Sequence, residues 1–158
     1  MVKIMSEISQ RNVRMEDAKL IYRWSNDEEV RKNSFSKEPI EWEVHLKWME
    51  KMLTDPFMVF RMICVDDEPV GMYRIQLIEK QGLISYSIAK EYRGLGYGSK
   101  CIQLIVRDFI DHYPQIEELV AYTKLDNVSS RKIFLKEGFK EHIQALEIRY
   151  TKKKEGIL

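Results

Sequence analysis

A glycine-rich turn is the part of this sequence whose residue types point most directly to chemistry. Residues 93–98 read Arg-Gly-Leu-Gly-Tyr-Gly. Glycine lets backbone N–H groups approach an anion without interference from a Cβ atom, and a helix that starts at such a turn adds the positive end of its dipole. The turn lies between a predicted strand that ends near Ala89 and a predicted helix that starts near Gly98. It therefore predicts a site that holds a pyrophosphate.

Three other kinds of turn also use closely spaced glycines. An ordinary tight connection also uses glycines, and on the turn alone that interpretation stays open. A dinucleotide site needs G-x-G-x-x-G in an early β-α-β unit with an acidic residue further on, whereas here G-x-G-x-G follows three strands expected to be antiparallel. A P-loop needs Gly-Lys-Ser/Thr at the end of the turn, and this sequence lacks it. Both nucleotide-binding alternatives are disfavoured.

The elements that must position the turn follow from the spacing of apolar residues. Helical periodicity predicts helices over residues 16–24, 40–53, 98–113 and 128–137. Short apolar and β-branched runs predict strands over residues 58–65, 70–79, 83–89, 118–123, 139–144 and 146–151. The first three strands are joined by short turns and are expected to be consecutive and antiparallel. The predicted fold class is α+β, a mixed and mostly antiparallel sheet flanked by helices.

Composition indicates one soluble domain that spans residues 1–158. Lys and Arg total 26 against 25 Asp and Glu, so no overall field favours nucleic acid or an anionic membrane as partner. No signal peptide and no membrane-spanning run is evident, so a cytoplasmic location is expected. Cys64 and Cys101 lie in apolar runs, where thiols are usually core residues, and no metal site is expected.

Two spaced motifs resemble those of the GNAT N-acetyltransferase family. The family's cofactor motif, Gln/Arg-x-x-Gly-x-Gly/Ala at a strand-to-helix turn, is matched by Arg93, Gly96 and Gly98. A second family element, Asn-x-x-Ser/Ala followed by an aromatic residue and Gly-Phe, is matched by Asn127, Ser130, Phe134, Gly138 and Phe139. The resemblance covers nearly the whole chain. It implies a GNAT-like sheet of about six to seven strands with about four helices, with acetyl-CoA as cofactor.

The N-terminal part is similar to one branch of that family, which contains ribosomal-protein N-terminal acetyltransferases and amino-sugar acetyltransferases. The matching residues are Arg14, Asp17, Trp24, Asn26, Asp27, Val30 and Arg31. Ile40, His45 and Trp48 also resemble the I-x-x-x-x-H-x-x-W pattern of sugar-nucleotide acetyltransferases in the pseudaminic-acid pathway. The resemblance implies a small-molecule amine as acceptor and favours an amino-sugar nucleotide. A protein N-terminus and a polyamine remain alternatives, and a homodimer formed through an exposed sheet edge is compatible with the sequence.

The resemblance implies three groups of site residues. The cofactor would contact Ile88, Ala89, Arg93, Gly94, Leu95, Gly96, Tyr97, Gly98, Ser99, Asn127, Ser130 and Phe134. The acceptor would contact Trp24, Asn26, Arg31 and His45, and the candidate catalytic residues are Asn127, Tyr86 and His45. The implied reaction is direct attack of a neutral primary amine on the thioester, with backbone donors near Ile88 and Ala89 polarising the carbonyl.

The sequence departs from the family at two catalytic positions. Phe134 stands where relatives carry a tyrosine that protonates the leaving thiolate, and phenylalanine has no proton to give. Tyr86 and Tyr122 are possible substitutes, or the group leaves as thiolate, which its pKa allows. Residues 84–88 also lack the glutamate that many relatives use as a base or to organise water. A CoA-binding regulatory module without turnover is therefore a second function class to be tested.

Overall fold

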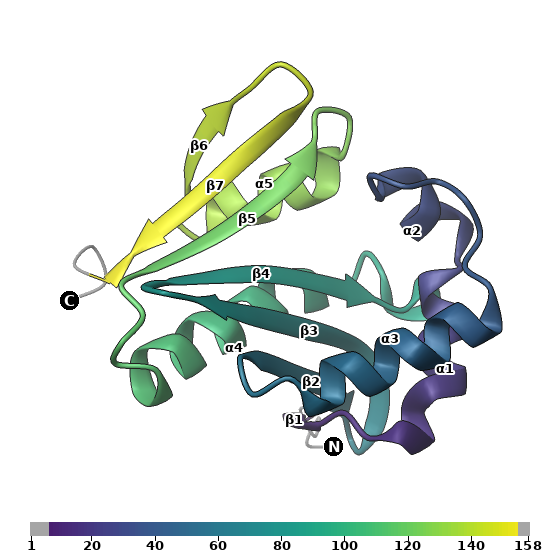
Figure 1. The fold of residues 1–158 in the computed structure, drawn as a ribbon. Helices are drawn as coiled ribbons and strands as arrows, with labels where there is room; N and C mark the ends of the chain where they lie inside the picture. Colours follow the sequence, from purple (N-terminus) through teal and green to yellow (C-terminus); the bar gives the residue numbers. More distant parts are fainter. Residues whose placement is uncertain (1–6, 155–158) are drawn as a thin grey trace, which may run out of the picture.

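The computed structural model describes residues 7–154, and the fold is built on a seven-stranded sheet with the strand order β1-β2-β3-β4-β5-β7-β6 (Figure 1). The strands are β1 (Ile8–Asn12), β2 (Met58–Val65), β3 (Glu68–Ile78), β4 (Gln81–Ile88), β5 (Glu118–Lys124), β6 (Lys140–Ile143) and β7 (Glu147–Lys153). The α-helices are α1 (Ala18–Ser25), α2 (Glu28–Asn33), α3 (Trp42–Thr54), α4 (Tyr97–His112) and α5 (Val128–Lys136). Two short 3-10 helices, η1 (Met15–Asp17) and η2 (Lys90–Tyr92), precede α1 and follow β4.

The predicted fold class, α+β with a mixed and mostly antiparallel sheet, is confirmed. Strands β2, β3 and β4 are consecutive and antiparallel, as their short connections predicted. Asp66 and Asp67 join β2 to β3 with φ values of 50° and 67°, the left-handed conformation that a two-residue hairpin turn requires. The one parallel pair in the described sheet joins β4 to β5, because α4 carries the chain back across the sheet between them.

Strand β1 and helix α2 were not anticipated from the sequence. Strand β1 reads Ile-Ser-Gln-Arg-Asn, and it pairs antiparallel with β2 at the edge of the sheet. Four of its five residues are polar, as suits a half-solvated edge strand, so β1 lacks the apolar signal of the strands that were predicted. Helix α2 has six residues and none of them is buried. An apolar stripe is therefore absent, and Asp27 at its N-cap is the signal of its start.

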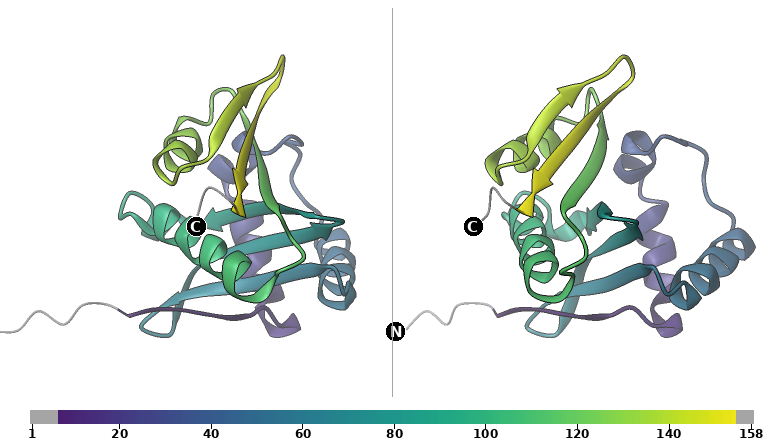
Figure 2. Two further views of the ribbon diagram at one scale, coloured as in Figure 1. Left: turned by 90° about the vertical axis from the view of Figure 1, so that its left-hand side faces the viewer. Right: turned by 60° about the vertical axis from the view of Figure 1, so that its left-hand side comes forward.

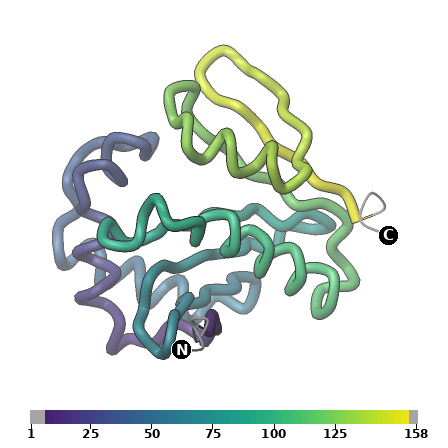
Figure 3. The backbone as a smooth tube through the Cα atoms, turned by 180° about the vertical axis from the view of Figure 1, so that it is seen from behind, coloured from purple at the N-terminus to yellow at the C-terminus, as the bar shows by residue number. Residues whose placement is uncertain are grey.

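Apolar residues pack on both faces of the sheet. On one face, α4 buries Cys101, Ile102, Ile105 and Phe109 against the strands, with Phe134 and Phe139 alongside. On the other face, α1 and α3 pack through Ile21, Trp24 and Met49. Figures 1 and 3, seen from opposite sides, show α1 and α3 on one face and α4 on the other. Both cysteines are free and buried, as expected.

Strands β4 and β5 separate soon after they begin to pair. Their ladder covers residues 81–83 of β4 and 118–120 of β5 and then stops. Beyond this point the two strands diverge, which opens the sheet like a V toward the C-terminal end of β4 (Figures 1 and 2). The glycine-rich turn follows β4 at this open end, because it lies between η2 and α4. The fold therefore places the candidate anion-binding turn beside the gap where β4 and β5 no longer pair.

Candidate active site

The glycine-rich turn adopts a backbone that suits anion binding. Gly94 and Gly96 have φ values of 77° and 88°, which residues with a Cβ atom adopt only with strain. No other atom lies within 4 Å of where a Cβ would stand at either position, so both face open space. Helix α4 starts at Tyr97, one residue before the predicted start near Gly98. Its first-turn N–H groups have no carbonyl within the helix to bond, so they remain available to an anion.

Gly98 serves packing as well as the turn. A Cβ atom there would lie 2.6 Å from Cδ1 of Ile133 on α5 and 3.7 Å from Tyr86. The absence of a side chain therefore lets the start of α4 approach α5 closely. The sequence assigned this glycine to the cofactor, and the structure adds a steric reason for it.

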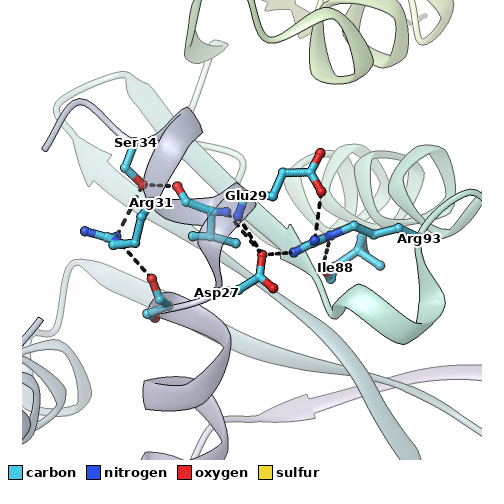
Figure 4. A network of polar contacts seen from close by, with 8 residues as sticks. Asp27, Glu29, Arg31, Ser34, Ile88 and Arg93 are labelled. Carbon is cyan, nitrogen blue, oxygen red and sulfur yellow. Dashed lines mark hydrogen bonds and ion pairs between the residues drawn. The ribbon is translucent and has the colours of Figure 1, made fainter. Parts of the chain in front are cut away.

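The Arg93 side chain is directed toward α2 (Figure 4). Its Nε donates to the Ile88 carbonyl at 3.0 Å, its Nη2 lies 3.0 Å from Asp27 and its Nη1 lies 2.9 Å from Glu29. The guanidinium thus joins the end of β4 to the N-terminus of α2. We infer that Arg93 shapes the turn and leaves the contacts with an anion to the backbone.

A cleft of about 750 Å³ begins at this turn and runs between the separated strands. It is bordered by β4 and β5, by α4 and α5 on the cofactor side, and by α2 and α3 on the opposite side. The predicted site residues that line it are Arg31, His45, Tyr86, Ile88, Arg93, Gly94, Tyr97, Gly98, Asn127, Ser130 and Phe134. Trp24, Asn26, Ala89, Leu95, Gly96 and Ser99 are not among its lining residues.

The cofactor side of the cleft carries a hydroxyl pair. The Tyr86 hydroxyl lies 2.9 Å from Ser130 Oγ, and the Tyr86 ring contacts the Phe134 ring edge to face at 5.9 Å. Burial raises the pKa of Tyr86 to about 12, so the phenol is protonated at neutral pH. Phe134 is 2% exposed and stacks on Tyr150 at 5.0 Å. Asn127 caps α5, where its side chain accepts from the Ser130 N–H at 3.4 Å.

The two candidate oxyanion donors, the N–H groups of Ile88 and Ala89, point in opposite directions from β4. The Ala89 N–H donates to the Val70 carbonyl of β3 at 2.8 Å and is therefore already used. Because N–H groups alternate in direction along an antiparallel strand, the Ile88 N–H points away from β3, toward the gap left by β5. The Ile88 carbonyl points the same way and meets Arg93. Of the two residues, Ile88 is thus the one that offers a backbone donor to the cleft.

The four residues predicted to contact the acceptor have partners inside the protein. Asn26 bonds both the N–H and the carbonyl of Ile40, at 2.8 and 3.0 Å. Arg31 donates to the carbonyls of Ser25, Ser36 and Glu38 and so holds residues 34–38 on α2. Trp24 is 6% exposed and belongs to the core beneath α1. These three side chains shape the acceptor side of the fold.

His45 is 1% exposed and joins α3 to α1, because its Nε2 lies 2.8 Å from the Ala18 carbonyl. Burial lowers the pKa of His45, although the bond to Ala18 opposes this effect. The ring stacks on Trp48 at 5.8 Å. The histidine reaches the wall of the cleft, but Nε2 is bound to the protein.

Two polar residues of the cleft were not singled out from the sequence. Thr123 on β5 is buried and its Oγ1 has no hydrogen-bond partner among the described residues. Arg74 on β3 lines the cleft beside Trp48. A charged residue inside the mostly apolar run Val70–Ile78 was the available signal for Arg74. The open glycine turn and the free N–H groups at the start of α4 fit an elongated ligand that ends in a pyrophosphate.

The family model for the acetyltransferase (GNAT) domain matches residues 9–140. The chain belongs to the GNAT acetyltransferase family. It is therefore an N-acetyltransferase that uses acetyl-CoA, and the resemblance of the two motifs to this family is confirmed. No curated protein sequence matches the chain. Within the described residues, no helix is long and apolar enough to cross a membrane, and no cluster of His, Cys, Asp and Glu suited to a metal is present.

Several solved structures share the fold at low sequence identity. A ribosomal L7/L12 alpha-N-protein acetyltransferase in complex with coenzyme A has 14% identity and a TM-score of 0.80, over 92% of this chain and 93% of that chain. Spermidine N-acetyltransferase from Vibrio cholerae, in complex with CoA and spermine, has 15% identity and a TM-score of 0.82, over 94% and 96%. The N-acetyltransferase PseH of Campylobacter jejuni has 16% identity and a TM-score of 0.73, over 93% and 98%. At these identities the likeness concerns the fold.

Proposed function

We propose that this protein transfers an acetyl group from acetyl-CoA to the primary amine of a small molecule, with an amino-sugar nucleotide as the favoured acceptor. The observation that carries the proposal is the cleft between β4 and β5, which meets the open glycine turn at one end and the α2 and α3 side at the other. One end suits a pyrophosphate and the other admits an amine. Both reactants can then be bound together, which is what direct transfer requires.

The cofactor would be held mainly by backbone groups. N–H groups of residues 94–99 would bind the pyrophosphate at the start of α4. The pantetheine arm would continue along β4, where the Ile88 N–H points into the gap. Asn127 and Ser130 would provide polar contacts from the α5 side. Acetyl-CoA, when bound, supplies the thioester that the amine attacks.

The residues of the chain position the reactants and manage one proton. The neutral amine would attack the thioester carbon, the C–S bond would break, and the amine proton would pass to solvent. Among the described lining residues, the Glu29 carboxylate is paired with Arg93 and Nε2 of His45 bonds Ala18, so neither is free to take that proton. The Ile88 N–H stabilises the negative charge that develops on the carbonyl oxygen. The Tyr86 hydroxyl, protonated and bonded to Ser130, would donate a hydrogen bond to the leaving sulfur, which departs as thiolate and takes its proton from solvent. It takes the place of the tyrosine that Phe134 replaces.

The acceptor proposal rests on residues of α3 and on the charges of the cleft. Ile40, His45 and Trp48 match the pattern of sugar-nucleotide acetyltransferases, and all three line the cleft. A polyamine would need acidic side chains to bind it. Glu29 is the one carboxylate among the described lining residues, and it already pairs with Arg93. A protein N-terminus stays as the second candidate acceptor.

The first experiment measures thiol release from acetyl-CoA with amino-sugar nucleotides, N-terminal peptides and polyamines, alongside CoA binding by calorimetry. Turnover with one acceptor class identifies the substrate type. CoA binding without turnover on any amine would support the regulatory module instead. Absence of CoA binding would contradict the role of residues 94–99.

The location and assembly of the protein remain predictions from the sequence. We propose that the protein is cytoplasmic and that residues 1–158 form one acetyltransferase domain. A homodimer is compatible with the open edge of β6, one of the two edge strands of the described sheet. Light scattering coupled to size exclusion would measure the oligomeric state.

A further inference from the structure

Arg74 is a cation on the acceptor side of the cleft. It lies in the middle of β3, and its guanidinium stands over the Trp48 ring with Cζ 5.0 Å from the ring centroid. Burial lowers the pKa of Arg74. Among residues 7–154 the guanidinium has no hydrogen bond or ion pair, and its contact with Trp48 is its one described polar interaction. A half-buried cation without a counter-ion has lost part of its hydration, so an anion bound beside Arg74 would be stabilised by its charge.

The other two arginines of the cleft differ from Arg74 in this respect. Arg31 donates to three backbone carbonyls, and Arg93 is held by Asp27, Glu29 and the Ile88 carbonyl. Their donors are largely satisfied by the protein. Among the described lining residues, Arg74 is thus the guanidinium that keeps its donors for a ligand.

Two hydroxyl groups lie on the same face of the sheet as Arg74. Ser85 of β4 is directly opposite Arg74 in the ladder, and Ser87 is opposite Met72, two residues further toward the glycine turn. Directly opposite residues have Cβ atoms about 4.5–5.5 Å apart, so Ser85 and Arg74 are neighbours. Tyr86 and Ile88 belong to the opposite face, in the core beside α4. The Arg74 side of the cleft is therefore distinct from the side assigned to the cofactor.

We propose that Arg74, with Ser85 beside it, binds an oxyanion carried by the acceptor, so that the preferred substrates are small amines that also bear a phosphate or a carboxylate. The inference rests on the proposed function and names the residue that would bind the phosphate of a sugar-nucleotide acceptor, or a carboxylate in its place. A guanidinium presents paired donors that match the oxygens of either anion. Stacking on Trp48 holds the guanidinium plane in place, which lowers the entropy lost when the anion binds.

The same charge would select against polycations. A polyamine would bring ammonium groups close to Arg74, and no free carboxylate lines the described cleft to compensate. Like charges at short range in a partly desolvated site are strongly unfavourable. Arg74 would also disfavour the ammonium form of the acceptor's own amine, which helps to present the neutral nucleophile.

The test compares glucosamine, glucosamine 1-phosphate, muramic acid and spermidine as acceptors in the thiol-release assay with the full chain. The phosphate and the carboxylate are then tested separately on one amino-sugar frame. The variants are Arg74→Gln, which removes the charge, and Arg74→Lys, which keeps it. Arg107→Gln on the exposed face of α4 is the matched control. Calorimetric binding of each compound to the CoA-saturated protein is measured in parallel, so that anion binding is observed with or without turnover.

For the wild type we expect kcat/KM for an anionic amino sugar to exceed that for glucosamine by about 10- to 100-fold, the effect of one or two charge-assisted hydrogen bonds. Arg74→Gln should remove this preference by raising KM for the anionic amino sugar, with unchanged CoA affinity. Arg74→Lys should keep part of the preference, and Arg107→Gln should keep all of it. Arg74-dependent binding of an anionic compound without turnover would support the anion site and contradict the proposed activity. Equal use of glucosamine and its phosphate, preference for spermidine, or anion binding that survives Arg74→Gln would overturn the inference. Should Arg74→Gln fail to fold, the comparison of the four acceptors on the wild type and on Arg74→Lys decides the question.

Discussion

At the scale of single residues, the site differs from its family where the leaving sulfur must be protonated. Phe134 is locked in an aromatic cluster, with Phe139 at 5.1 Å and Tyr150 at 5.0 Å, so its ring serves the core. The nearest acidic proton on this wall belongs to Tyr86, whose hydroxyl meets Ser130. The pair stands beside Phe134 and borders the cleft, which makes Tyr86 the residue to test.

The first prediction concerns Tyr86→Phe. We expect kcat to fall by about 10-fold, the value of one hydrogen bond to a charged atom, with little change in CoA affinity. Because burial raises the pKa of Tyr86 to about 12, its proton stays in place through neutral and mildly alkaline pH. The wild-type kcat should therefore not decline up to about pH 10 through loss of this proton. Tyr122→Phe, on the other wall of the cleft, is the control and should leave kcat unchanged. Equal effects of the two substitutions would assign Tyr86 a packing role.

The second prediction concerns Gly96→Ala. A Cβ atom would meet no neighbour there, so the expected damage comes from the φ of 88°, at about 1–2 kcal/mol. That strain should shift the backbone of the turn away from its binding conformation. CoA binding, measured by calorimetry, should weaken by about 10-fold or more. Gly138→Ala has the same conformational strain at the end of α5, outside the cleft. It should lower stability and leave CoA affinity intact. Similar CoA affinities for the two variants would contradict the assignment of the turn.

At the scale of elements, single side chains hold the acceptor side together. His45 fastens α3 to α1 through the Ala18 carbonyl, and Arg31 holds the segment after α2. Asp27 has a double role. It caps α2 by accepting from the Glu29 and Val30 N–H groups at 3.1 and 3.2 Å, and it pairs with Arg93 at 3.0 Å. The helix beside the acceptor and the turn beside the cofactor are thus joined by one carboxylate.

The third prediction follows from His45. Burial lowers its pKa, so the folded state favours the neutral ring and the stabilisation is complete above the ordinary value of about 6.5. As pH falls below that value the unfolded chain takes up the proton first, and stability should decline. Urea unfolding should give a lower free energy of unfolding at pH 5.5 than at pH 7.5 for the wild type. This difference between the two pH values should be smaller in His45→Gln and unchanged in His142→Gln on β6. A wild-type stability that does not change between these pH values would contradict the prediction.

The fourth prediction concerns Asp27→Ala. The change removes the cap of α2, worth about 0.5–2 kcal/mol, together with the ion pair to Arg93. We expect faster hydrogen exchange in α2, a higher KM for the acceptor and a smaller loss of CoA affinity. Glu28→Ala, on the exposed first turn of α2, should have little effect. Unchanged hydrogen exchange and an unchanged KM in Asp27→Ala would show that the connection between α2 and Arg93 does not affect acceptor binding.

A pH dependence follows from the same carboxylate. Burial raises the pKa of Asp27, but the Arg93 bond and the Val30 N–H outweigh burial and lower it overall. Its contribution to stability is therefore present above the ordinary value near 3.9 and is lost as pH falls below it. The joint between α2 and the turn should persist through the neutral range.

At the scale of the whole molecule, the cleft separates two parts of one sheet. Strands β1 to β4 with α1 to α4 form one part, and β5 to β7 with α5 form the other. They are joined by a short parallel ladder and by contacts between α4 and α5. A ligand bound along the cleft would contact both parts. Binding should therefore stabilise the molecule against global unfolding.

The fifth prediction is a thermal shift. CoA at about 100 times its Kd should add about 2.7 kcal/mol to the free energy of unfolding. For a chain of this size each kcal/mol raises Tm by about 2–4 °C, so Tm should rise by about 5–10 °C in differential scanning fluorimetry. Pantetheine at the same concentration lacks the pyrophosphate and should give a much smaller shift. Equal shifts for the two ligands would contradict binding of the pyrophosphate at residues 94–99.

The sequence by itself determined the local features of this protein. Glycine spacing predicted the turn, apolar periodicity predicted α1, α3, α4 and α5, and short apolar runs predicted β2 to β7. The two motifs predicted the family. Each motif describes a glycine turn or a helix cap, and the conformation of such a feature depends mainly on residues close to it in the sequence. Strand β1 and helix α2 were missed because neither has an apolar pattern of its own.

Only the tertiary structure decided how individual side chains are used. Arg31 and Arg93 are motif residues, yet their guanidinium groups bond the protein, while Arg74 carries no motif and keeps its donors for the cleft. Ala89 was named as an oxyanion donor, but sheet pairing uses its N–H and leaves that of Ile88. Which donors remain free depends on partners distant in the sequence, such as Val70 of β3 or Asp27 before α2. Spacing along the chain does not predict those partners, because the residues meet only when the sheet and its helices assemble.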